Sequence, residues 1–225
     1  MTQPERLTRE QVAEAGLTDW RPLLGRLRTR FGTGDFGTGM DLVTRIGEVA
    51  AAAGQHADLT LTEASLVVGV GEAAAGGVTQ QDVDLARAIS EQAEALAIAA
   101  DPGGVTQLEL GLDVDDTSRN AAYYAALLGG EVVNGEPYDA SGQVPTVWWQ
   151  TPPQRPEDEG PALPAQDFEQ RWHFDVWVAE DEGERRVQAA LAAGGRLVSD
   201  KAAPAYWVLE DPDGNRACIC TPASR

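Results

Sequence analysis

The chain has 225 residues, 43% of them hydrophobic, which is enough for two domains with their own cores. Its formal net charge of −19, from 36 acidic and 17 basic residues, would repel nucleic acid phosphates and anionic membrane surfaces. No apolar run is long enough to span a membrane, and the N-terminus lacks the pattern of a secretory signal. We therefore expect a cytoplasmic protein whose partner is a small molecule, with neither nucleic acid nor membrane bound.

The first half of the chain predicts two amphipathic helices separated by a strand. Apolar residues recur at helical spacing over residues 40–53, and Gly54 is placed to end that helix. A β-branched alternation follows over residues 59–70. Thr79 is predicted to cap the second helix, because the Asp82 carboxylate three residues later favours a helix start. The apolar stripes of the two helices comprise Leu42, Val43, Ile46, Val49 and Ala50, then Val83, Ala86, Ile89, Ala93 and Leu96.

A cluster of turn-forming residues divides the chain near its middle. The sequence "DPGG" at residues 101–104 lies between a helical pattern and a strand pattern, and such breakers are typical of a linker. We therefore predict one domain over residues 1–101 and a second over residues 104–225, both of the α+β class. A proline-rich and acidic stretch over residues 151–169 has no periodicity, so it is predicted to be an exposed loop.

One pattern occurs twice in the second half of the chain. "LELGLDVDDTSRNAAYYAALLGGEVV" predicts strand, helix, Gly-Gly and strand, and "WHFDVWVAEDEGERRVQAALAAGGRLV" repeats that order. The repeat predicts two similar βα-type units packed side by side. Each helix is expected to stop at its glycine pair in a left-handed cap, at Gly129-Gly130 and at Gly194-Gly195.

The first domain resembles the pterin-4a-carbinolamine dehydratases. The matching segments occur in the family's order: "LTDWRPLLGRLRTRF", then Asp35-Phe36, the first helix, "GQHADL" and "AGGVTQQDVDLARAI". The resemblance implies an α+β fold and dehydration of a 4a-hydroxytetrahydropterin, with histidines as acid and base. Imidazole suits this chemistry because its pKa lies near neutrality.

The family's histidine pattern is only partly present in this chain. By the resemblance, the motif is roughly His-His-Pro-x-Trp, with a third histidine after the next strand. Here Gln55 and His56 stand at the two histidine positions, and Ala73 stands at the third. Loss of one proton-transfer group costs about 10²–10⁴ in rate. The candidate catalytic residues are therefore His56 and the retained Asp82, with Asp58 able to assist.

The second domain resembles the glyoxalase-like branch of the vicinal-oxygen-chelate superfamily. "DDTSRNAAYYAALLGGEVV" and the closing "YWVLEDPDGNRACIC" carry the likeness, which implies paired βαβββ units around a small-molecule cup. By the resemblance, metal-dependent members place one ligand on each of four strands. Glu109, His173 and Cys218 fall at three such positions, and the fourth falls near Trp148, Trp149 or Gln150 with its register left open. This incomplete set predicts no metal, and no other cofactor is expected.

The cup is predicted to be apolar and lined by aromatic rings, as small-molecule sites usually are. Trp148 and Trp149 are adjacent on one predicted strand, so one faces in and the other out. Further rings near the same sheet come from Trp172, Trp177, Tyr206 and Trp207. The predicted substrate-binding residues are Glu109, Trp148, Trp149, His173 and Cys218.

Three hypotheses for the function remain open from the sequence. The chain could be an enzyme, either a hydro-lyase on 4a-hydroxytetrahydropterin or a vicinal-oxygen-chelate enzyme acting through Glu109 and His173. It could instead bind or sequester a pterin-like or other planar aromatic molecule without turnover. It could also be an interaction module that forms homo-oligomers through its helices and acts as a partner of other proteins, as the resemblance to the dehydratases implies.

Overall fold

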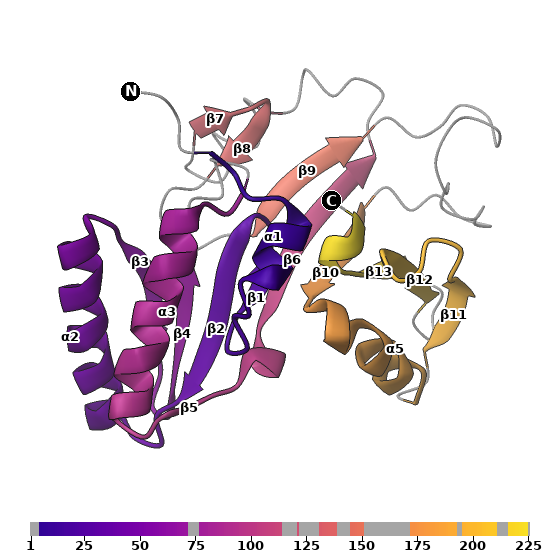
Figure 1. Cartoon of the computed structure of the whole chain (residues 1–225). Helices are drawn as coiled ribbons and strands as arrows, with labels where there is room; N and C mark the ends of the chain where they lie inside the picture. Colours follow the sequence, from indigo (N-terminus) through magenta and orange to yellow (C-terminus); the bar gives the residue numbers. More distant parts are fainter. Residues whose placement is uncertain are drawn as a thin grey trace. The chain divides into compact units, whose positions relative to one another are not determined.

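A computed structural model describes residues 5–71, 77–113, 121, 131–138, 145–150, 172–192, 195–210 and 216–224 of the chain. The chain divides into two compact units, Met1–Val105 and Thr106–Arg225 (Figure 1). Both units mix helices and strands, which confirms the predicted α+β class. Outside the described residues lie the expected loop 151–169, most of the first repeat's helix with Gly129-Gly130, and Ala73.

The first unit is an antiparallel sheet with two long helices on one face, as the purple and magenta ribbons of Figure 1 show. The described sheet order is β1-β2-β4-β3, and β5 pairs with β2. The elements are α1 (Arg9–Glu14), β1 (Arg21–Leu23), β2 (Arg26–Gly32), α2 (Phe36–Ala53), β3 (Ala57–Leu61), β4 (Ser65–Val70), α3 (Gln80–Ala95), β5 (Ala99–Ala100) and the 3₁₀ turn η2 (Pro102–Gly104).

Helix α2 begins earlier than its apolar stripe predicted. The Asp35 side chain accepts a hydrogen bond from the Thr38 N–H at 2.9 Å, so this carboxylate caps a helix that starts at Phe36 rather than residue 40. The predicted end is confirmed, because Gly54 adopts the left-handed conformation with φ of 64°. Leu42, Ile46 and other members of the stripe are buried against the sheet.

Two further predictions concern the segment that precedes α3. The single strand predicted over residues 59–70 is a hairpin, since the Thr62 N–H donates to the Ser65 carbonyl at 2.8 Å and reverses the chain. The predicted cap of α3 is confirmed. Thr79 and Asp82 form a reciprocal capping box, with each side chain bonded to the other's backbone N–H.

The second unit contains a mixed six-stranded sheet and a separate hairpin. The described order across the sheet is β11-β12-β13-β10-β6-β9. The elements are β6 (Thr106–Asp113), β7 (Glu131–Val133), β8 (Glu136–Tyr138), β9 (Thr146–Gln150), β10 (Trp172–Val178), the 3₁₀ turn η3 (Glu180–Glu182), α5 (Gly183–Ala192), β11 (Arg196–Ser199), β12 (Tyr206–Glu210), β13 (Arg216–Cys220) and the 3₁₀ turn η4 (Pro222–Ser224).

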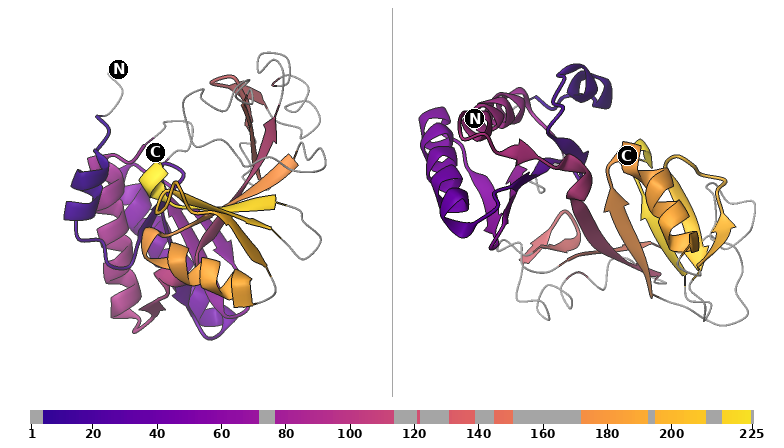
Figure 2. Two further views of the ribbon diagram at one scale, coloured as in Figure 1. Left: turned by 90° about the vertical axis from the view of Figure 1, so that its right-hand side faces the viewer. Right: turned by 90° about the horizontal axis from the view of Figure 1, so that it is seen from below.

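The internal repeat predicted from the sequence is visible in the strand pairing. Strands β6 and β10 pair antiparallel at the centre, and each pairs on its other side with the last strand of its own repeat. These outer pairs, β6 with β9 and β10 with β13, are both parallel. Helix α5 lies on one face of the sheet (Figure 2). Its Val187 packs in one buried cluster with Val178 and Trp207.

The glycine pair expected to cap α5 is only partly described, because Gly194 lies outside the described residues. The Gly195 N–H donates to the Ala190 carbonyl oxygen at 3.0 Å, and a Cβ added to Gly195 would lie 2.9 Å from that oxygen. Glycine is therefore needed at position 195 for close approach of the chain to the helix end, and the left-handed cap stays a prediction.

No helix in the described part of the chain is both long and apolar enough to cross a membrane.

Candidate functional site

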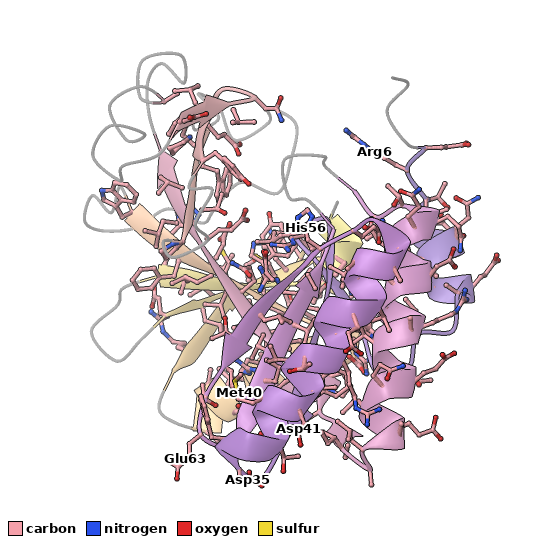
Figure 3. The ribbon with its side chains drawn as sticks, turned by 90° about the vertical axis from the view of Figure 1, so that its left-hand side faces the viewer. Arg6, Asp35, Met40, Asp41, His56 and Glu63 are labelled. Atoms are coloured by element: carbon pink, nitrogen blue, oxygen red, sulfur yellow. The ribbon has the colours of Figure 1, made fainter. Side chains whose placement is uncertain are left out.

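His56 lies at the junction between α2 and β3. The left-handed Gly54 turns the chain out of the helix, and His56 follows as an exposed side chain just before Ala57 begins the strand. Figure 3 shows His56 at the opposite end of α2 from Asp35. Because Ala57 pairs with Val70, the next step of the same register brings His56 beside Gly71. An exposed imidazole at this place can exchange protons with solvent.

Asp58, the second predicted catalytic residue, already holds a partner. Its carboxylate oxygen lies 2.6 Å from Nη1 of Arg26, whose side chain reaches across from β2. The pair contributes no more than about 1 kcal/mol to stability, because Asp58 itself is exposed. The guanidinium nevertheless occupies the carboxylate, so Asp58 is positioned as an ion-pair partner rather than as an acid or base.

Asp82, the third predicted residue, is buried and serves the start of α3. One of its oxygens accepts hydrogen bonds from the Thr79 N–H and the Thr79 hydroxyl, both at 2.8 Å. A Cβ added to Gly71 would lie 3.4 Å from the Asp82 carboxyl carbon, so Asp82 packs directly on that glycine. Asp82 therefore lies at the end of β4 that pairs with the start of β3, the strand that His56 precedes.

Gln55 stands in this region with an unsatisfied acceptor. Its amide nitrogen donates to Oε1 of Gln81 at a long 3.4 Å. Its own Oε1 is buried and has no hydrogen-bond partner among the described residues. Since a buried polar atom without a partner costs about 1–3 kcal/mol, this oxygen is suited to accept a donor from a bound molecule. Sequence reasoning could identify only the residue type at this position, not its unsatisfied oxygen.

In the second unit, most predicted binding residues lie on one face of the sheet. The pairing places Glu109 opposite Asp175, and Asp175 opposite Cys218. In the neighbouring row, Gly111 lies between His173 on one side and Trp148 on the other. Side chains two residues apart on a strand share a face, so these two rows form a single surface, hereafter the polar sheet face.

The aromatic residues predicted to line the cup divide between the two faces. Trp177 alternates with His173 and Asp175 on β10 and so belongs to the polar sheet face, as does Tyr206, which pairs with Cys220. Trp149 and Trp172 pair with Leu112 and lie on the other face. Trp207 also lies there, in the core under α5.

The prediction of an apolar cup is wrong for the described part of this face. Glu109, His173 and Asp175 are only 3%, 8% and 6% exposed, so the buried surface is strongly polar. Glu210 is buried on the same face and is held by Arg216 at 3.1 Å. Sequence reasoning missed Asp175 and Glu210. The alternation of polar residues in "WHFDVWV" was the available signal for Asp175.

His173 lies over the space left by a glycine. A Cβ at Gly111 would be 2.8 Å from Nε2 of His173 and 3.3 Å from the Trp148 ring. The two rings meet edge to face with centroids 6.3 Å apart. Nε2 of His173 lies 3.6 Å from Oδ1 of Asp175, beyond hydrogen-bond distance. Within the described residues, the Trp148 Nε1 donor is buried with no partner.

The two cysteines of β13 are free and buried on the polar sheet face. A hydrogen bond with the Cys218 side chain, together with burial and the Asp175 charge, raises the pKa of the Cys220 thiol. Burial also raises the pKa of Tyr206, and electrostatic interactions with the two cysteines and Asp175 raise it further. Cys220 is therefore kept protonated, so it is neither a nucleophile nor a thiolate ligand at neutral pH.

These donors do not fit a divalent metal. No group of three His, Cys, Asp or Glu side chains in the described ranges is arranged to hold one. The residue beside Glu109 on β9 is Thr146, so no strong ligand completes that row. We derive no chemical step from a metal at this face.

Comparison with known proteins matches both units to families. Residues 5–92 match the model of the family described as "Pterin 4 alpha carbinolamine dehydratase", and residues 109–220 match a "Glyoxalase-like domain". The chain is 34% identical over 91 residues to a Nocardia farcinica protein named "Putative pterin-4-alpha-carbinolamine dehydratase", covering 40% of this chain and 96% of that protein.

Two further proteins are similar to part of the chain. A Thermosynechococcus vestitus protein of the same name is 35% identical over 79 residues, covering 35% of this chain and 83% of that protein. A crystal structure titled as a transcriptional coactivator/pterin dehydratase from Brucella melitensis is 23% identical with a TM-score of 0.36, covering 40% of this chain and 99% of that one.

Proposed function

The chain belongs to the pterin 4 alpha carbinolamine dehydratase family through its first unit and carries a glyoxalase-like domain in its second, and from this premise we propose that it binds a pterin-like molecule and, through His56, slowly dehydrates a 4a-hydroxytetrahydropterin. Two adjacent side chains carry the proposal. His56 is exposed, and the Oε1 atom of Gln55 is buried with no hydrogen-bond partner in the described part of the unit.

The roles of the two residues follow from their chemistry. Loss of water from the 4a carbon needs a proton on the leaving hydroxyl and loss of another from the ring. His56 donates the first proton to the leaving hydroxyl and is reprotonated by solvent, because its ring is exposed. Gln55 cannot transfer a proton, but its Oε1 accepts a hydrogen bond from the substrate and orients it.

The proposed reaction is slow because its other candidate groups are occupied. Asp58 is held by Arg26, and Asp82 is held by the start of α3. A single imidazole therefore supplies both acid and base, where a second group would contribute about 10²–10⁴ in rate.

The proposal is tested by following dehydration of freshly generated 4a-hydroxytetrahydropterin by absorbance, with the full chain and its His56→Ala variant. We expect acceleration over buffer that His56→Ala removes and that added imidazole partly restores. Glu63→Gln is the matched control, because Glu63 is exposed at the far end of the unit, as Figure 3 shows.

A rate equal to buffer for the unchanged protein, or an equal rate for His56→Ala, would reject the dehydratase proposal. The non-catalytic alternatives, a small-molecule binder or an interaction module, would then take its place.

A further inference from the structure

Strand β2 carries three arginines on one face of the first unit's sheet. Arg26, Arg28 and Arg30 occupy alternate positions, so their side chains share a face. Leu27 and Phe31, which lie between them, are buried in the core with residues of α2 and α3. The three guanidinium groups therefore belong to the sheet face opposite these helices, hereafter the arginine face. Like charges this close repel each other unless anionic groups lie among them.

Carboxylates from other elements lie beside the two outer arginines. Nη1 of Arg26 lies 2.6 Å from the Asp58 carboxylate on β3, and Arg30 forms an ion pair with Asp101. Burial and the Arg26 charge lower the pKa of the central Arg28, and the Asp58 charge opposes them only in part. Because Asp58 is exposed, water screens its charge. One screened carboxylate thus serves two guanidinium groups.

Two guanidinium donors on this face are buried without a partner. The Nε atoms of Arg26 and Arg28 have no hydrogen-bond partner among the described residues, and the Arg26 side chain is only 12% exposed. Native proteins generally satisfy buried polar groups, so two neighbouring exceptions indicate a partner from outside the fold. The Nε–H of an arginine and its neighbouring Nη–H are parallel and can donate to two oxygens of one anion.

Gly69 on β4 allows the two guanidinium groups to lie close together. It pairs with Arg28 on one side and with Asp58 on the other, so these three residues form one row across the sheet. A Cβ added to Gly69 would lie 3.3 Å from Nη2 of Arg26, so the Arg26 side chain crosses over this glycine to reach Asp58. The row includes the exposed Asp58 on β3, where a small molecule can approach from solvent.

The charges of this row select the ligand. Arg26 and Arg28 together carry two positive charges against the one negative charge of Asp58, which leaves an excess of one. A carboxylate neutralises this excess and offers two acceptor oxygens. A phosphate monoester carries close to two negative charges at neutral pH and would reverse the excess. The chain's net charge of −19 further disfavours multiply charged anions.

We infer that the arginine face binds a small molecule through one carboxylate group, which accepts hydrogen bonds from Nε of Arg28 and Nε of Arg26 beside Gly69. The site uses neither His56 nor Gln55. It therefore stands or fails independently of the proposed dehydration.

Three probes built on one benzene ring test the inference: benzoate, neutral benzamide and phenyl phosphate. Nuclear magnetic resonance of the ¹⁵N-arginine-labelled full chain at neutral pH follows the Nε signals, with Arg26→Lys and Arg28→Lys assigning two of them. We expect benzoate to shift the Arg26 and Arg28 signals until it saturates the protein. Benzamide and phenyl phosphate should bind at least about tenfold more weakly, because one lacks the charge and the other carries too much.

Variants then locate the carboxylate, with benzoate affinity read from the Arg26 signal. Arg28→Gln should weaken benzoate binding about tenfold or more. Gly69→Ala should weaken it too, because the new Cβ meets the Arg26 guanidinium. Arg87→Gln is the matched control and should not change it, because Arg87 is exposed on α3, on the helix side of the sheet. Asp58→Asn should instead tighten benzoate binding, since it removes the competing carboxylate, and a damaged fold would not raise affinity.

Three results would overturn the inference. The first is the absence of a saturable shift of the Arg26 and Arg28 signals with benzoate. The second is binding of benzamide or phenyl phosphate as tightly as benzoate. The third is a benzoate affinity that neither falls in Arg28→Gln nor rises in Asp58→Asn.

Discussion

The two units differ in whether their candidate polar side chains already form hydrogen bonds or ion pairs within the fold. In the first unit, Asp58 holds an ion pair and Asp82 holds a helix cap, whereas His56 is an exposed imidazole. In the second unit, the Trp148 Nε1 atom is buried with no hydrogen-bond partner among the described residues. A polar side chain is thus informative about function only after its structural partners have been counted. The comparison can be broken by testing engaged groups for stability and unsatisfied groups for binding.

The largest effect is expected from an engaged group of the second unit. Arg216 and Glu210 form a buried ion pair at 3.1 Å, so Arg216→Ala leaves a buried carboxylate short of one partner. We expect a loss of roughly 3–5 kcal/mol in unfolding free energy, read from urea denaturation. A loss below about 1 kcal/mol would mean that the second partner of Glu210, Arg196, suffices by itself.

The next effect concerns rate. Gln55→His places a second imidazole beside His56, at the position where the family motif has a histidine. We expect dehydration of 4a-hydroxytetrahydropterin to accelerate by about 10²-fold, since a second proton-transfer group typically contributes at least that much. An unchanged rate would show that the lack of a second imidazole does not limit dehydration by this unit.

Packing in the second unit should depend on the absence of a side chain at one position. In Gly111→Ala, the new Cβ would lie 2.8 Å from Nε2 of His173 and would displace that ring. We expect a loss of about 1–3 kcal/mol in unfolding free energy, read from urea denaturation, because the added methyl group overpacks this site. Gly47→Ala is the control, because a Cβ there meets nothing within 4 Å. Equal unfolding free energies of Gly111→Ala and the unchanged protein would contradict the placement of His173.

A smaller effect is expected from the capping box of the first unit. Thr79→Ala removes the hydroxyl that bonds Asp82, so we expect a loss of about 1 kcal/mol in stability, with Thr79→Ser retaining most of it. Thermal denaturation of the three proteins checks this. If Thr79→Ala denatured at the same temperature as the unchanged protein, the capping bond would not stabilise the fold. Asp82 would then again be a candidate catalytic residue.

The smallest effect is expected where a group is unsatisfied. Trp148→Phe removes a buried N–H that has no partner in the described structure, so unfolding free energy should change by less than about 0.5 kcal/mol. A loss well above 1 kcal/mol, measured by denaturation without ligand, would show that the indole N–H is already satisfied.

The sequence predicted the features that depend on local spacing. The stripe of α2, its end at Gly54 and the capping box of Thr79 with Asp82 each involve residues close in the chain. The internal repeat was also readable, because its two copies share one order of elements.

The features that the sequence could not predict depend on register between distant strands. The Arg26–Asp58 pair joins strands that touch only through β4. The alignment of Glu109 with Asp175 joins residues far apart in the chain. The same limit explains the aromatic residues: alternation separates Trp148 from Trp149, but only the pairing with Gly111 shows which of them shares a face with His173.

The central claim, that a pterin-like molecule binds beside His56, has a direct test because the chain contains two histidines, one in each unit. Nuclear magnetic resonance of ¹⁵N-histidine-labelled protein would follow both imidazoles during titration with pterin, with His56→Ala assigning the signals. We predict that the His56 signals move until pterin saturates the protein. Saturable pterin binding that leaves the His56 signals unmoved would contradict the claim.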